Sequence, residues 1–472
     1  MADKTYKLEF GLSDGTTQEV RFTVPQGEAG KSAYEYAKEA GYTGTEEEFA
    51  EKIAAASAVK VGDTLTTART DLDETWLLCN GDQVSAQDYG ELAKLFPSLP
   101  TNWGGDGLWS SATGISINCI AYANGYWVVG GGYYDGSAYK ARIAYTTDPT
   151  GTWTTKDLWT GGGANYTINC VTYANGYWVV GGTCVDSIYY ARIAYTTDIT
   201  GEWTTKDLWS GTFSTVRCIT YTNGYWVLGG ILGGSSTYYA RIAYTADLTG
   251  TWTTKDLWSG AVAGNTCINC MTYANGYWVV GGGYYDGSKR YARIAYATDL
   301  TGSWTTNNLW YATTSIINCI THANGYWVVG GVYYNNYKYN ARIAYATDPT
   351  GAWTTKDLWS NDSHENNVTG IANCGSYWVV CARYYYDGCF DTRVAYTTDI
   401  TGEWTIEDLW NGESAVVCAN CIAYANRYWV VGGTYVSGSV DYARIAYSDS
   451  GVFVLPTISG KDTYTYIKAK EE

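Results

Sequence analysis

The 472-residue sequence is poor in positive charge and in histidine. Its 30 lysines and arginines are outnumbered by 46 aspartates and glutamates, which gives a formal net charge of −16. This balance argues against nucleic acid as a partner, because no basic surface would attract phosphates, and it disfavours anionic membranes. No apolar run approaches the ~20 residues that span a bilayer, and we find no signal peptide at the N-terminus. We therefore expect no membrane insertion, and a protein that is assembled in a cytoplasm and released by lysis.

The chain is dominated by a repeat. The segment Ala123–Val129 (ANGYWVV) recurs seven times with small changes, and the tryptophans of successive copies are 48 to 52 residues apart. A period near 50 residues indicates a propeller or a solenoid. The seven tryptophans are Trp127, Trp178, Trp226, Trp278, Trp327, Trp378 and Trp429.

Each repeat contains four short runs that are rich in aromatic and β-branched residues and bounded by turn residues, which predicts four strands. In the first copy, Asn124-Gly125 predicts a two-residue hairpin turn, because both residues tolerate positive φ. Four antiparallel strands, seven times over, predict a mainly β fold with a seven-bladed β-propeller. A solenoid would need parallel stacking and polar end caps, and neither is seen.

Paired tryptophans predict how the ring closes. Trp153 and Trp159 are six residues apart, and the same spacing recurs in the next five repeats. The last repeat has no such pair, but Trp103 and Trp109 stand before the first full repeat. Residues 103–109 should therefore form the outer strand of the seventh blade and leave no exposed strand edge.

The segments that flank the propeller predict a small α+β module. We expect a β-hairpin around Ser13–Gly15, short helices over 31–40 and 46–56, and a capping box formed by Thr45 and Glu48. Beyond the propeller, the segments 453–456 (FVLP) and 463–468 (TYTYIK) complete the chain.

Three stretches carry a resemblance to phage tail proteins. Gly30–Ala37 (GKSAYEYA) and Gly41–Phe49 (GYTGTEEEF) resemble the attachment region of tail-fibre and baseplate proteins from phages of Gram-positive bacteria. Trp76–Gly81 (WLLCNG) is similar to phage tail-collar domains, whose later pieces stand here only after the propeller. The resemblance implies a virion or phage-tail-like particle, other tail or baseplate proteins as partners, and a homotrimer.

This resemblance divides the chain into four expected parts. They are an attachment region at 1–57, a collar-like segment at 58–102, the propeller at 103–450, and a return to the collar-like module at 451–472. The turn around Asp148–Trp153 resembles a relaxed Asp-box from sialidase-type propellers. Its spacing is not strict, so the resemblance is to a turn and not to an enzyme family.

The two faces of the propeller differ in sequence. The first and third turns of a blade share one face, and they read Asn-Gly-Tyr and Asp-x-Thr-Gly in most copies. The second turns and the inter-blade loops share the other face, here called the variable face, and they differ in every blade. Chain entry near Trp103 and exit near Gly451 lie on the uniform face, so the collar-like module should attach there and the variable face should point outward.

The variable face is rich in Tyr, Gly, Ser, Asn and Asp, the residues that antibody loops use for rigid contact area and adaptable hydrogen bonding. Polar, variable loops are also common without any binding role. We expect ligand binding at this face, through Tyr133, Tyr134, Asp135, Asp186, Tyr189, Tyr284, Tyr285, Asp286, Arg290, Tyr333, Tyr334, Tyr385, Tyr386, Asp387, Tyr435 and Asp441.

Other patterns have structural explanations. An arginine recurs on the third strand of every blade, from Arg142 to Arg444, and is expected to form a structural ion pair, for example with turn aspartates such as Asp148. The only histidines, His322 and His364, lie in different blades without a triad pattern. Six cysteines stand eight residues before the repeat tryptophans, where a small buried thiol fits beside the axis. The C-x-x-C pairs are poorly placed for zinc, since residues i and i+3 of a strand face opposite ways. Cys381 and Cys389 could pair in an oxidising medium.

An acidic cluster leaves an alternative open. Paired carboxylates could hydrolyse a glycoside or hold Ca²⁺. The cluster comprises Asp362, Glu365, Asp387, Asp391 and Glu413. The main expectation is a non-enzymatic receptor-binding protein without a cofactor, whose tyrosines stack on a bacterial cell-surface carbohydrate. The alternative is a glycan-cleaving depolymerase that works on the same face.

Overall fold

The computed structural model describes residues 4–11, 17–24, 33–39, 41–49, 60–67, 72, 75–86, 88–93, 95–96, 98, 100–111, 115–161, 166–261, 265–335, 337–361, 366–375, 377–386, 389–410, 417–437, 440–448, 452–455, 458–460 and 463–470. The chain forms two compact units, one from residues 1–81 with 456–472 and the other from residues 82–455. Among the described helices, none has the length and apolar character needed to cross a membrane.

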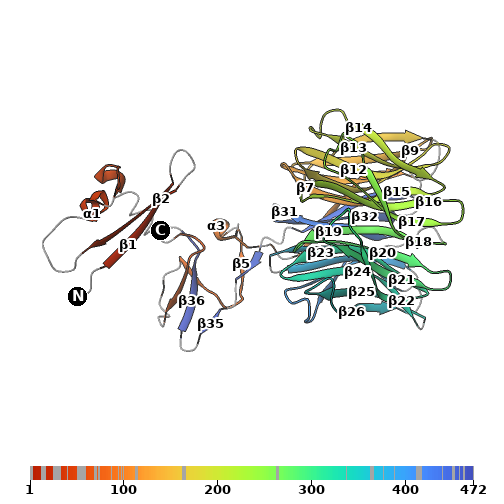
Figure 1. Cartoon of the computed structure of the whole chain (residues 1–472). Helices are drawn as coiled ribbons and strands as arrows, with labels where there is room; N and C mark the ends of the chain where they lie inside the picture. The colour runs from red at the N-terminus through yellow and green to blue at the C-terminus, as the bar shows by residue number, and fades with distance from the viewer. Residues whose placement is uncertain are drawn as a thin grey trace. The chain divides into compact units, whose positions relative to one another are not determined.

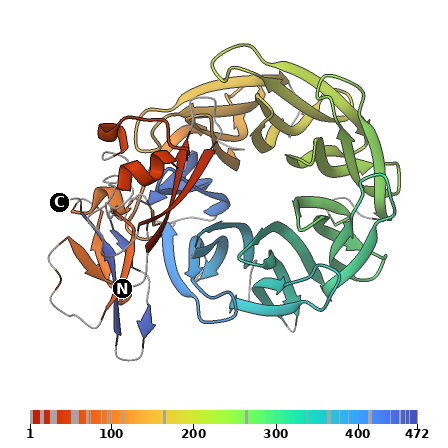
Figure 2. The ribbon, with the colours of Figure 1, turned by 60° about the vertical axis from the view of Figure 1, so that its left-hand side comes forward.

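The larger unit holds seven four-stranded antiparallel sheets, which form the ring of blades seen in Figure 2. Blades one to three are β7(Ser116–Ala123) β8(Tyr126–Tyr134) β9(Tyr139–Thr146) β10(Thr154–Gly161), β11(Thr167–Ala174) β12(Tyr177–Val185) β13(Tyr189–Thr196) β14(Thr204–Gly211), and β15(Ser214–Thr222) β16(Tyr225–Gly233) β17(Tyr238–Thr245) β18(Thr253–Gly260). Blades four to six are β19(Cys267–Ala274) β20(Tyr277–Tyr285) β21(Arg290–Ala297) β22(Thr305–Ala312), β23(Thr314–Ala323) β24(Tyr326–Asn335) β25(Lys338–Ala346) β26(Thr354–Asn361), and β27(Asn367–Cys374) β28(Tyr377–Tyr386) β29(Cys389–Thr397) β30(Thr405–Trp410). The seven-bladed propeller is confirmed.

Blade seven closes the ring as predicted. It combines β31(Cys418–Ala425), β32(Tyr428–Ser437) and β33(Val440–Ser448) with β6(Trp103–Ser111), and Trp103 lies opposite Ser448. The indole nitrogen of Trp109 donates to the carbonyl of Gly132 in blade one, 3.4 Å away. Trp159 makes the equivalent contact from blade one to blade two, at 2.9 Å. The seam between first and last blades is therefore built like the others.

The repeat tryptophans form the core between blades. Trp127 and its six equivalents are the largest fully buried side chains among the described residues, and each lies on the second strand beside buried valines or leucine. Trp127 also packs against Tyr122 of the neighbouring strand, with ring centroids 5.0 Å apart. Burial of an aromatic side chain of this size stabilises the fold by about 2–3 kcal/mol, so seven copies account for much of the core.

The positive-φ turns explain the Asn-Gly sequence of the uniform face. Asn124 and Gly125 have φ values of 49° and 80°, a conformation that asparagine and glycine adopt readily. The third turn of blade one is held by Asp148, whose carboxylate accepts hydrogen bonds from the backbone nitrogen and hydroxyl of Thr150 at 2.9 and 2.8 Å. Lys156 crosses to the next blade and donates to the carbonyl of Gly201.

The end of the chain returns to pair with the segment before the propeller. Within the larger unit, β34(Val452–Val454) pairs with β5(Gln83–Ser85), and α3(Gly90–Ala93) follows. The hydroxyl of Ser98 donates to the carbonyl of Arg427 in the first turn of blade seven, at 2.6 Å. Within the larger unit, Ser98 thus contacts blade seven at a turn of the uniform face.

The smaller unit contains an eighth four-stranded sheet, which is not a blade. Its strands are β3(Thr64–Thr67), β36(Thr463–Lys468), β35(Ser459–Gly460) and β4(Trp76–Leu78). A two-stranded sheet of β1(Lys4–Gly11) and β2(Thr17–Val24) forms the expected hairpin, and α1(Ala33–Glu39) the first helix. Thr45 and Glu48 form the expected capping box, at 2.8 and 3.1 Å, but most of the second expected helix lies outside the described residues.

Candidate functional site

The strand register brings the second turns and the inter-blade loops to one face of the propeller. In blade one, Tyr134 of β8 lies opposite Tyr139 of β9, at the end of the sheet that leads to the next blade through Gly161. The predicted binding residues described by the structure therefore share this variable face. They belong to six blades, so the question is which of them meet in one place.

In five blades, a tyrosine of the second strand packs on the arginine of the third strand. The Arg142 guanidinium is 3.9 Å from the ring centroid of Tyr133, and the Arg293 guanidinium is 3.6 Å from that of Tyr284. Tyr333, Tyr384 and Tyr435 have the same relation to their arginines. This repeated cation–π contact gives these rings a structural role in addition to any contact with a ligand.

The arginines do not pair with the turn aspartates as expected. Arg142 instead forms a two-pronged ion pair with Asp157 of β10, at 2.6 and 3.1 Å. Equivalent pairs join Arg192 to Asp207, Arg241 to Asp256, Arg342 to Asp357 and Arg393 to Asp408. The reason is the strand pairing, because each of these arginines lies directly opposite its aspartate on the neighbouring strand. The turn carboxylate is already used by its own backbone.

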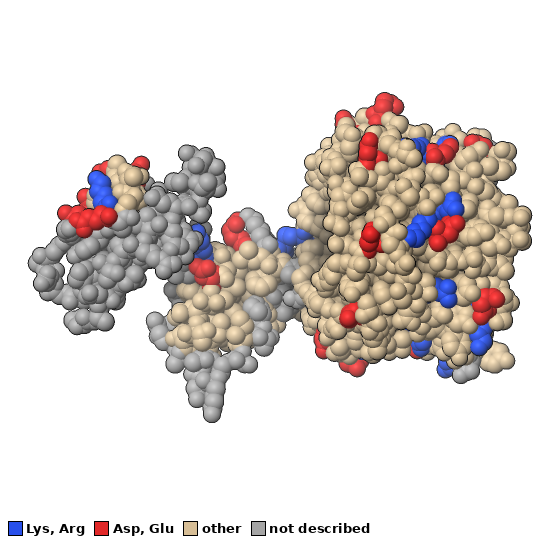
Figure 3. All heavy atoms as spheres, viewed as in Figure 1, with Lys and Arg blue, Asp and Glu red and all other residues tan. Residues whose placement is uncertain are grey.

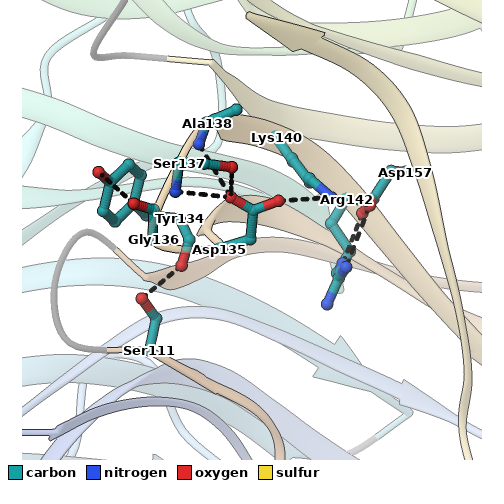
Figure 4. A network of polar contacts seen from close by, with 9 residues as sticks. All are labelled: Ser111, Tyr134, Asp135, Gly136, Ser137, Ala138, Lys140, Arg142 and Asp157. Atoms are coloured by element: carbon teal, nitrogen blue, oxygen red, sulfur yellow. Dashed lines mark hydrogen bonds and ion pairs between the residues drawn. The ribbon is translucent and has the colours of Figure 1, made fainter. Parts of the chain in front are cut away.

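Blade one shows how completely such charges are neutralised (Figure 4). Lys140 contacts both Asp135, at 2.9 Å, and Asp157, at 3.3 Å. The contact with Lys140, and further hydrogen bonds from Ser137 and the backbone of Ala138, hold the pKa of Asp135 well below its usual value. Every charge in this hairpin therefore has a partner of opposite sign. Figure 3 shows such adjacent blue and red patches on an otherwise mostly uncharged propeller surface.

Blade four departs from this pattern. Asn308 stands where five other blades have aspartate, and its side-chain oxygen accepts a hydrogen bond from Arg293 at 2.7 Å without adding negative charge. Burial accordingly lowers the pKa of Arg293, whereas Asp207 raises that of Arg192 in blade two. The carboxylate of Asp286 is occupied by the backbone of Lys289 and Ser288, and by the hydroxyl of Tyr291 at 2.9 Å.

These changes surround a cavity of about 770 Å³ between blades four and five, here called the cleft. Figure 1 shows β20–β22 next to β23–β26 on this side of the ring. The described lining of the cleft has three cations, Lys289, Arg290 and Arg342, and no carboxylate. Of these three, only Arg342 has an ion-pair partner among the described residues. The lining comprises Tyr285, Ser288, Lys289, Arg290, Asn308, Leu309, Trp310, Tyr311, Ala312, Thr313, Tyr333, Asn335 and Arg342.

Aromatic rings and hydrogen-bonding groups accompany the cations. The Lys289 ammonium is 4.6 Å from the ring centroid of Tyr311, and Tyr311 is 57% exposed. Arg290 reaches the hydroxyl of Thr314, 3.3 Å away. The hydroxyls of Tyr285 and Tyr333 are engaged by Gly287 and Asn335, at 2.8 and 2.7 Å. The cleft can therefore hold an anionic ligand that also presents apolar and hydroxyl surfaces.

The cleft brings together three of the predicted residues, Tyr285, Arg290 and Tyr333. The others stay apart: Tyr133, Tyr134 and Asp135 in blade one, Asp186 and Tyr189 in blade two, Tyr385 in blade six, and Tyr435 and Asp441 in blade seven. Tyr284 and Asp286 belong to the cleft hairpin without lining it, and Tyr334 packs on Tyr339 at 4.2 Å. The side chain of Tyr386, and all of Asp387, lie outside the described residues.

Sequence reasoning missed Lys289, Tyr311, Asn335 and Asn308. A signal was present, because the outer strand of blade four reads Thr-Thr-Asn-Asn where four other blades read Thr-Thr-Lys-Asp. Blade four has lost the strand-four aspartate and has gained Lys289 and Arg290, so it differs electrostatically from its sibling blades.

The acidic cluster is not assembled in the described part of the chain. Asp362, Glu365, Asp387 and Glu413 lie outside the described residues, which leaves Asp391 in β29. Within the described ranges, no group of three or more His, Cys, Asp or Glu residues could hold a metal ion.

Four of the six axial cysteines are buried, as expected, and Cys319 and Cys421 are half-buried. The thiol of Cys119 donates to the carbonyl of Gly130 at 3.6 Å, and burial raises its pKa. Twelve of the cysteines, including Cys381, are in no disulfide bond that the structure describes, and the pairing of Cys381 with Cys389 stays a prediction. The side chain of Cys389 lies outside the described residues.

No known family profile matches the sequence, and no curated protein is similar to it. Solved propellers are similar in fold. A polysaccharide lyase of family PL25, an ulvan lyase bound to -[GlcA(1-4)Rha3S]-, aligns at 11% identity with a TM-score of 0.50, over 76% of this chain and 96% of the lyase. The endosialidase of phage phi92 aligns at 10% identity with a TM-score of 0.44, over 78% and 70%. A Trypanosoma rangeli sialidase aligns at 12% identity with a TM-score of 0.38, over 72% of this chain and 55% of the sialidase.

These neighbours correct one expectation. The solved ulvan lyase, which aligns with a TM-score of 0.50, is a polysaccharide lyase, and this finding contradicts the expectation of a non-enzymatic protein. The similarity itself establishes a β-propeller fold, and the chain spans little more than half of the trypanosomal sialidase.

Proposed function

We propose that the propeller binds an acidic polysaccharide of a bacterial surface in the cleft between blades four and five, and cleaves it by β-elimination. The protein would act at the tail of a phage or a phage-tail-like particle. The observation that carries the proposal is the lining of the cleft. In a chain of net charge −16, it gathers Lys289 and Arg290 beside three tyrosines and contains no described carboxylate.

Charge and shape define the ligand class. A guanidinium recognises a carboxylate with two parallel hydrogen bonds, and tyrosine rings pack on the apolar faces of sugars. A cavity of about 770 Å³ accommodates a few sugar residues of a longer chain. We therefore take a uronate-containing polysaccharide as the substrate class. The solved ulvan lyase, which is bound to a glucuronate-containing chain, is consistent with this choice.

The lining also favours elimination over hydrolysis. Hydrolysis commonly needs two carboxyl groups on either side of the scissile bond, and the described lining supplies none. In elimination, a base removes the proton at C5 of the uronate, the C4–O bond breaks, and a C4=C5 double bond forms. The oxygen that leaves C4 takes up a proton. Arg290 and Lys289 would neutralise the carboxylate and stabilise the negative charge that develops beside it. Tyr311 is exposed and its ring centroid lies 4.6 Å from the Lys289 ammonium, so we assign to it the transfer of the proton from C5 to the departing oxygen.

The tail location rests on the attachment-region and collar-like sequences, and on the strand pairing that joins the chain before the propeller to the chain after it. We further propose a homotrimer formed through residues 1–100 and 453–472, with the variable face pointing away from the particle. Sedimentation of the full chain measures the copy number, and a monomer at micromolar concentration would contradict the trimer.

The test of cleavage uses the full-length protein and a panel of glucuronate- and galacturonate-containing polysaccharides, with neutral glucans as the control. We expect ultraviolet absorbance from an unsaturated uronate with at least one acidic polymer. Tyr311→Phe should abolish this product and retain polymer binding, measured by affinity electrophoresis. Tyr337→Phe is the matched control, because Tyr337 is 83% exposed in blade five and does not line the cleft.

Two results would overturn the proposal. One is the absence of unsaturated product with every acidic polymer, including polysaccharide extracted from a host that the particle attaches to. The other is product formation by Tyr311→Phe at the rate of the Tyr337→Phe control. Saturated oligosaccharides as the only products would show hydrolysis and reject elimination.

A further inference from the structure

A second cavity opens at the axis of the propeller, separate from the cleft. It has a volume of about 690 Å³, and its lining includes Thr167, Thr215 and Asn367, which lie at or near the start of the first strands of blades two, three and six. First strands begin on the variable face, so the cavity lies at that end of the central channel. It is called the axial cup below.

Seven polar side chains encircle the axial cup, one from each blade. Each occupies a bulge in the first strand, where one residue has no partner on the second strand and is directed away from the ladder. The seven are Asn118, Asn169, Arg217, Asn269, Asn318, Thr369 and Asn420. Below them the channel continues past aliphatic side chains such as Ile120 and Val171, in a smaller cavity of about 250 Å³. The cup thus has polar walls above an apolar floor.

The amide groups of this ring are held in fixed orientations. The side-chain nitrogen of Asn118 donates to the carbonyl of Ile168 in the next blade at 3.0 Å, and Asn169 donates to Val216 at 2.9 Å. Asn318 donates to Val368 at 2.9 Å. Because the nitrogens are used between blades, the amide oxygens of these three residues remain as acceptors at the wall of the cup.

Two arginines depart from the repeat and both line the cup. Arg217 replaces the asparagine of five other blades, and Arg383 stands where the equivalent strand-two residues are glycine, threonine, isoleucine or valine. Arg217 donates to the side-chain oxygen of Asn269 at 2.5 Å, and Arg383 to that of Asn420 at 3.2 Å. The Nε of Arg383 is buried without a hydrogen-bond partner.

The charge of the cup is not compensated within the described structure. The side-chain partners of both arginines are neutral asparagines, and the described lining of the cup contains no aspartate or glutamate. An arginine whose Nε is desolvated without a partner is costly unless something else completes its hydrogen bonds. A ligand carrying a carboxylate or a phosphate would accept hydrogen bonds from the terminal guanidinium nitrogens of Arg217 and Arg383, while its hydroxyls would meet the amide oxygens of the ring.

We propose that the axial cup is a second glycan site, which binds one anionic sugar or polyol unit through Arg217 and Arg383. Its place at the end of a channel suits a chain terminus or a branch, whereas the cleft lies at the side of the ring and suits an internal segment of a polymer. This site does not depend on cleavage at the cleft. A carboxylate from an acidic sugar and a phosphate from a wall polymer share the chemistry that the arginines recognise.

The repeats themselves supply conservative variants for the test. Arg217→Asn restores the residue of five sibling blades, and Arg383→Thr restores that of blade two, so both are expected to fold. Glucuronic acid and glycerol 3-phosphate serve as probes for the two anionic sources, and glucose and glycerol as their neutral controls. Binding to the full-length protein is measured by saturation-transfer nuclear magnetic resonance and calorimetry, with thermal unfolding to check each variant.

We expect at least one anionic probe to bind, and its affinity to fall as salt is added. In an Arg290→Ala background, which removes binding of the probe in the cleft, the double variant Arg217→Asn/Arg383→Thr should weaken the remaining binding at least tenfold. In the wild-type background, the double variant should keep the polymer cleavage proposed above, so the two proposals fail separately. Equal binding by Arg290→Ala with and without the double variant, both folded, or no binding of either anion by Arg290→Ala, would overturn the axial site.

Discussion

Blades one and four share a Tyr-Tyr-Asp-Gly hairpin, but the charges around it are balanced differently. In blade one, two cations face two carboxylates, and the cluster of Lys140, Asp135 and Asp157 is closed on itself. In blade four, Asn308 replaces the strand-four acid and Lys289 and Arg290 line an open cleft. The same fold therefore carries a structural charge cluster in one blade and a surplus of positive charge in the other. The difference shows that a binding site in a repeat protein is best sought in the repeat whose residues depart from those that the other repeats share.

The largest expected effect comes from giving blade four the residues of blade one. Lys289→Ala/Arg290→Tyr copies Ala138 and Tyr139. Each charge-assisted hydrogen bond contributes about 1.5–3 kcal/mol, so affinity for an acidic polysaccharide should fall on the order of 100-fold. Affinity electrophoresis measures it. The control is Lys140→Tyr, which copies blade four into blade one and should leave polymer affinity within about twofold.

The next largest effect is on the free energy of unfolding, and it is expected when Asp157 of blade one is replaced. Burial alone would raise the pKa of Asp157, but hydrogen bonds from Arg142 and Lys140 outweigh this and hold the pKa below its usual value. Asp157→Asn should lower the free energy of unfolding at pH 7 by about 1–3 kcal/mol, measured with denaturant.

The pH dependence of that effect has a definite sign. A lowered pKa means that the ionised Asp157 stabilises the fold above the unfolded-state pKa of about 4 and ceases to do so as the pH falls through the folded-state value. The difference between wild type and Asp157→Asn should therefore shrink below about pH 4. Asp256→Asn in blade three, where Arg241 is the one ion-pair partner among the described residues, should cost less than Asp157→Asn. A larger cost in blade three would contradict the role given to Lys140.

The smallest effect is expected from Asn308→Asp, which makes blade four resemble its siblings. The new carboxylate would pair with Arg293, and it should stabilise the protein by about 0.5 kcal/mol in this partly exposed setting. It would also place a negative charge in the cleft, so affinity for an acidic polymer should fall a few-fold. Stabilisation together with unchanged affinity would show that the cleft does not attract its ligand electrostatically.

Much of the fold could be predicted from the sequence, because the same strand and turn patterns recur in seven copies. The period, the Asn-Gly turns and the tryptophan pairs predicted the blades and the closing strand, and each depends on local chemistry that repeats. The partner of Arg142 was not accessible, since Asp148 is the nearer aspartate in sequence, whereas strand pairing places Asp157 opposite Arg142.

The site was harder to predict for a related reason. Tyrosine density pointed to the variable face, but most of those tyrosines have structural partners such as Arg142 or Tyr139. The cleft joins β21 and β22 of one blade to β24 of the next, and sequence spacing does not show which side chains meet across such a boundary. The ring of polar side chains at the axis could not be predicted either. Regular strand alternation would pair Asn118 with the second strand, but a bulge leaves it unpaired and directs it toward the channel.

The closing strand also has a consequence during synthesis. The ribosome makes β6 first, yet its partner β33 emerges about 330 residues later. At ordinary elongation rates of ~5–20 residues per second, this strand waits roughly 15–65 s without a partner. Six blades can form while the seventh is missing its outer strand. Nascent chains that meet one another in this interval could exchange β6, so a burst of closely spaced translation should favour entangled, domain-swapped chains over closed rings.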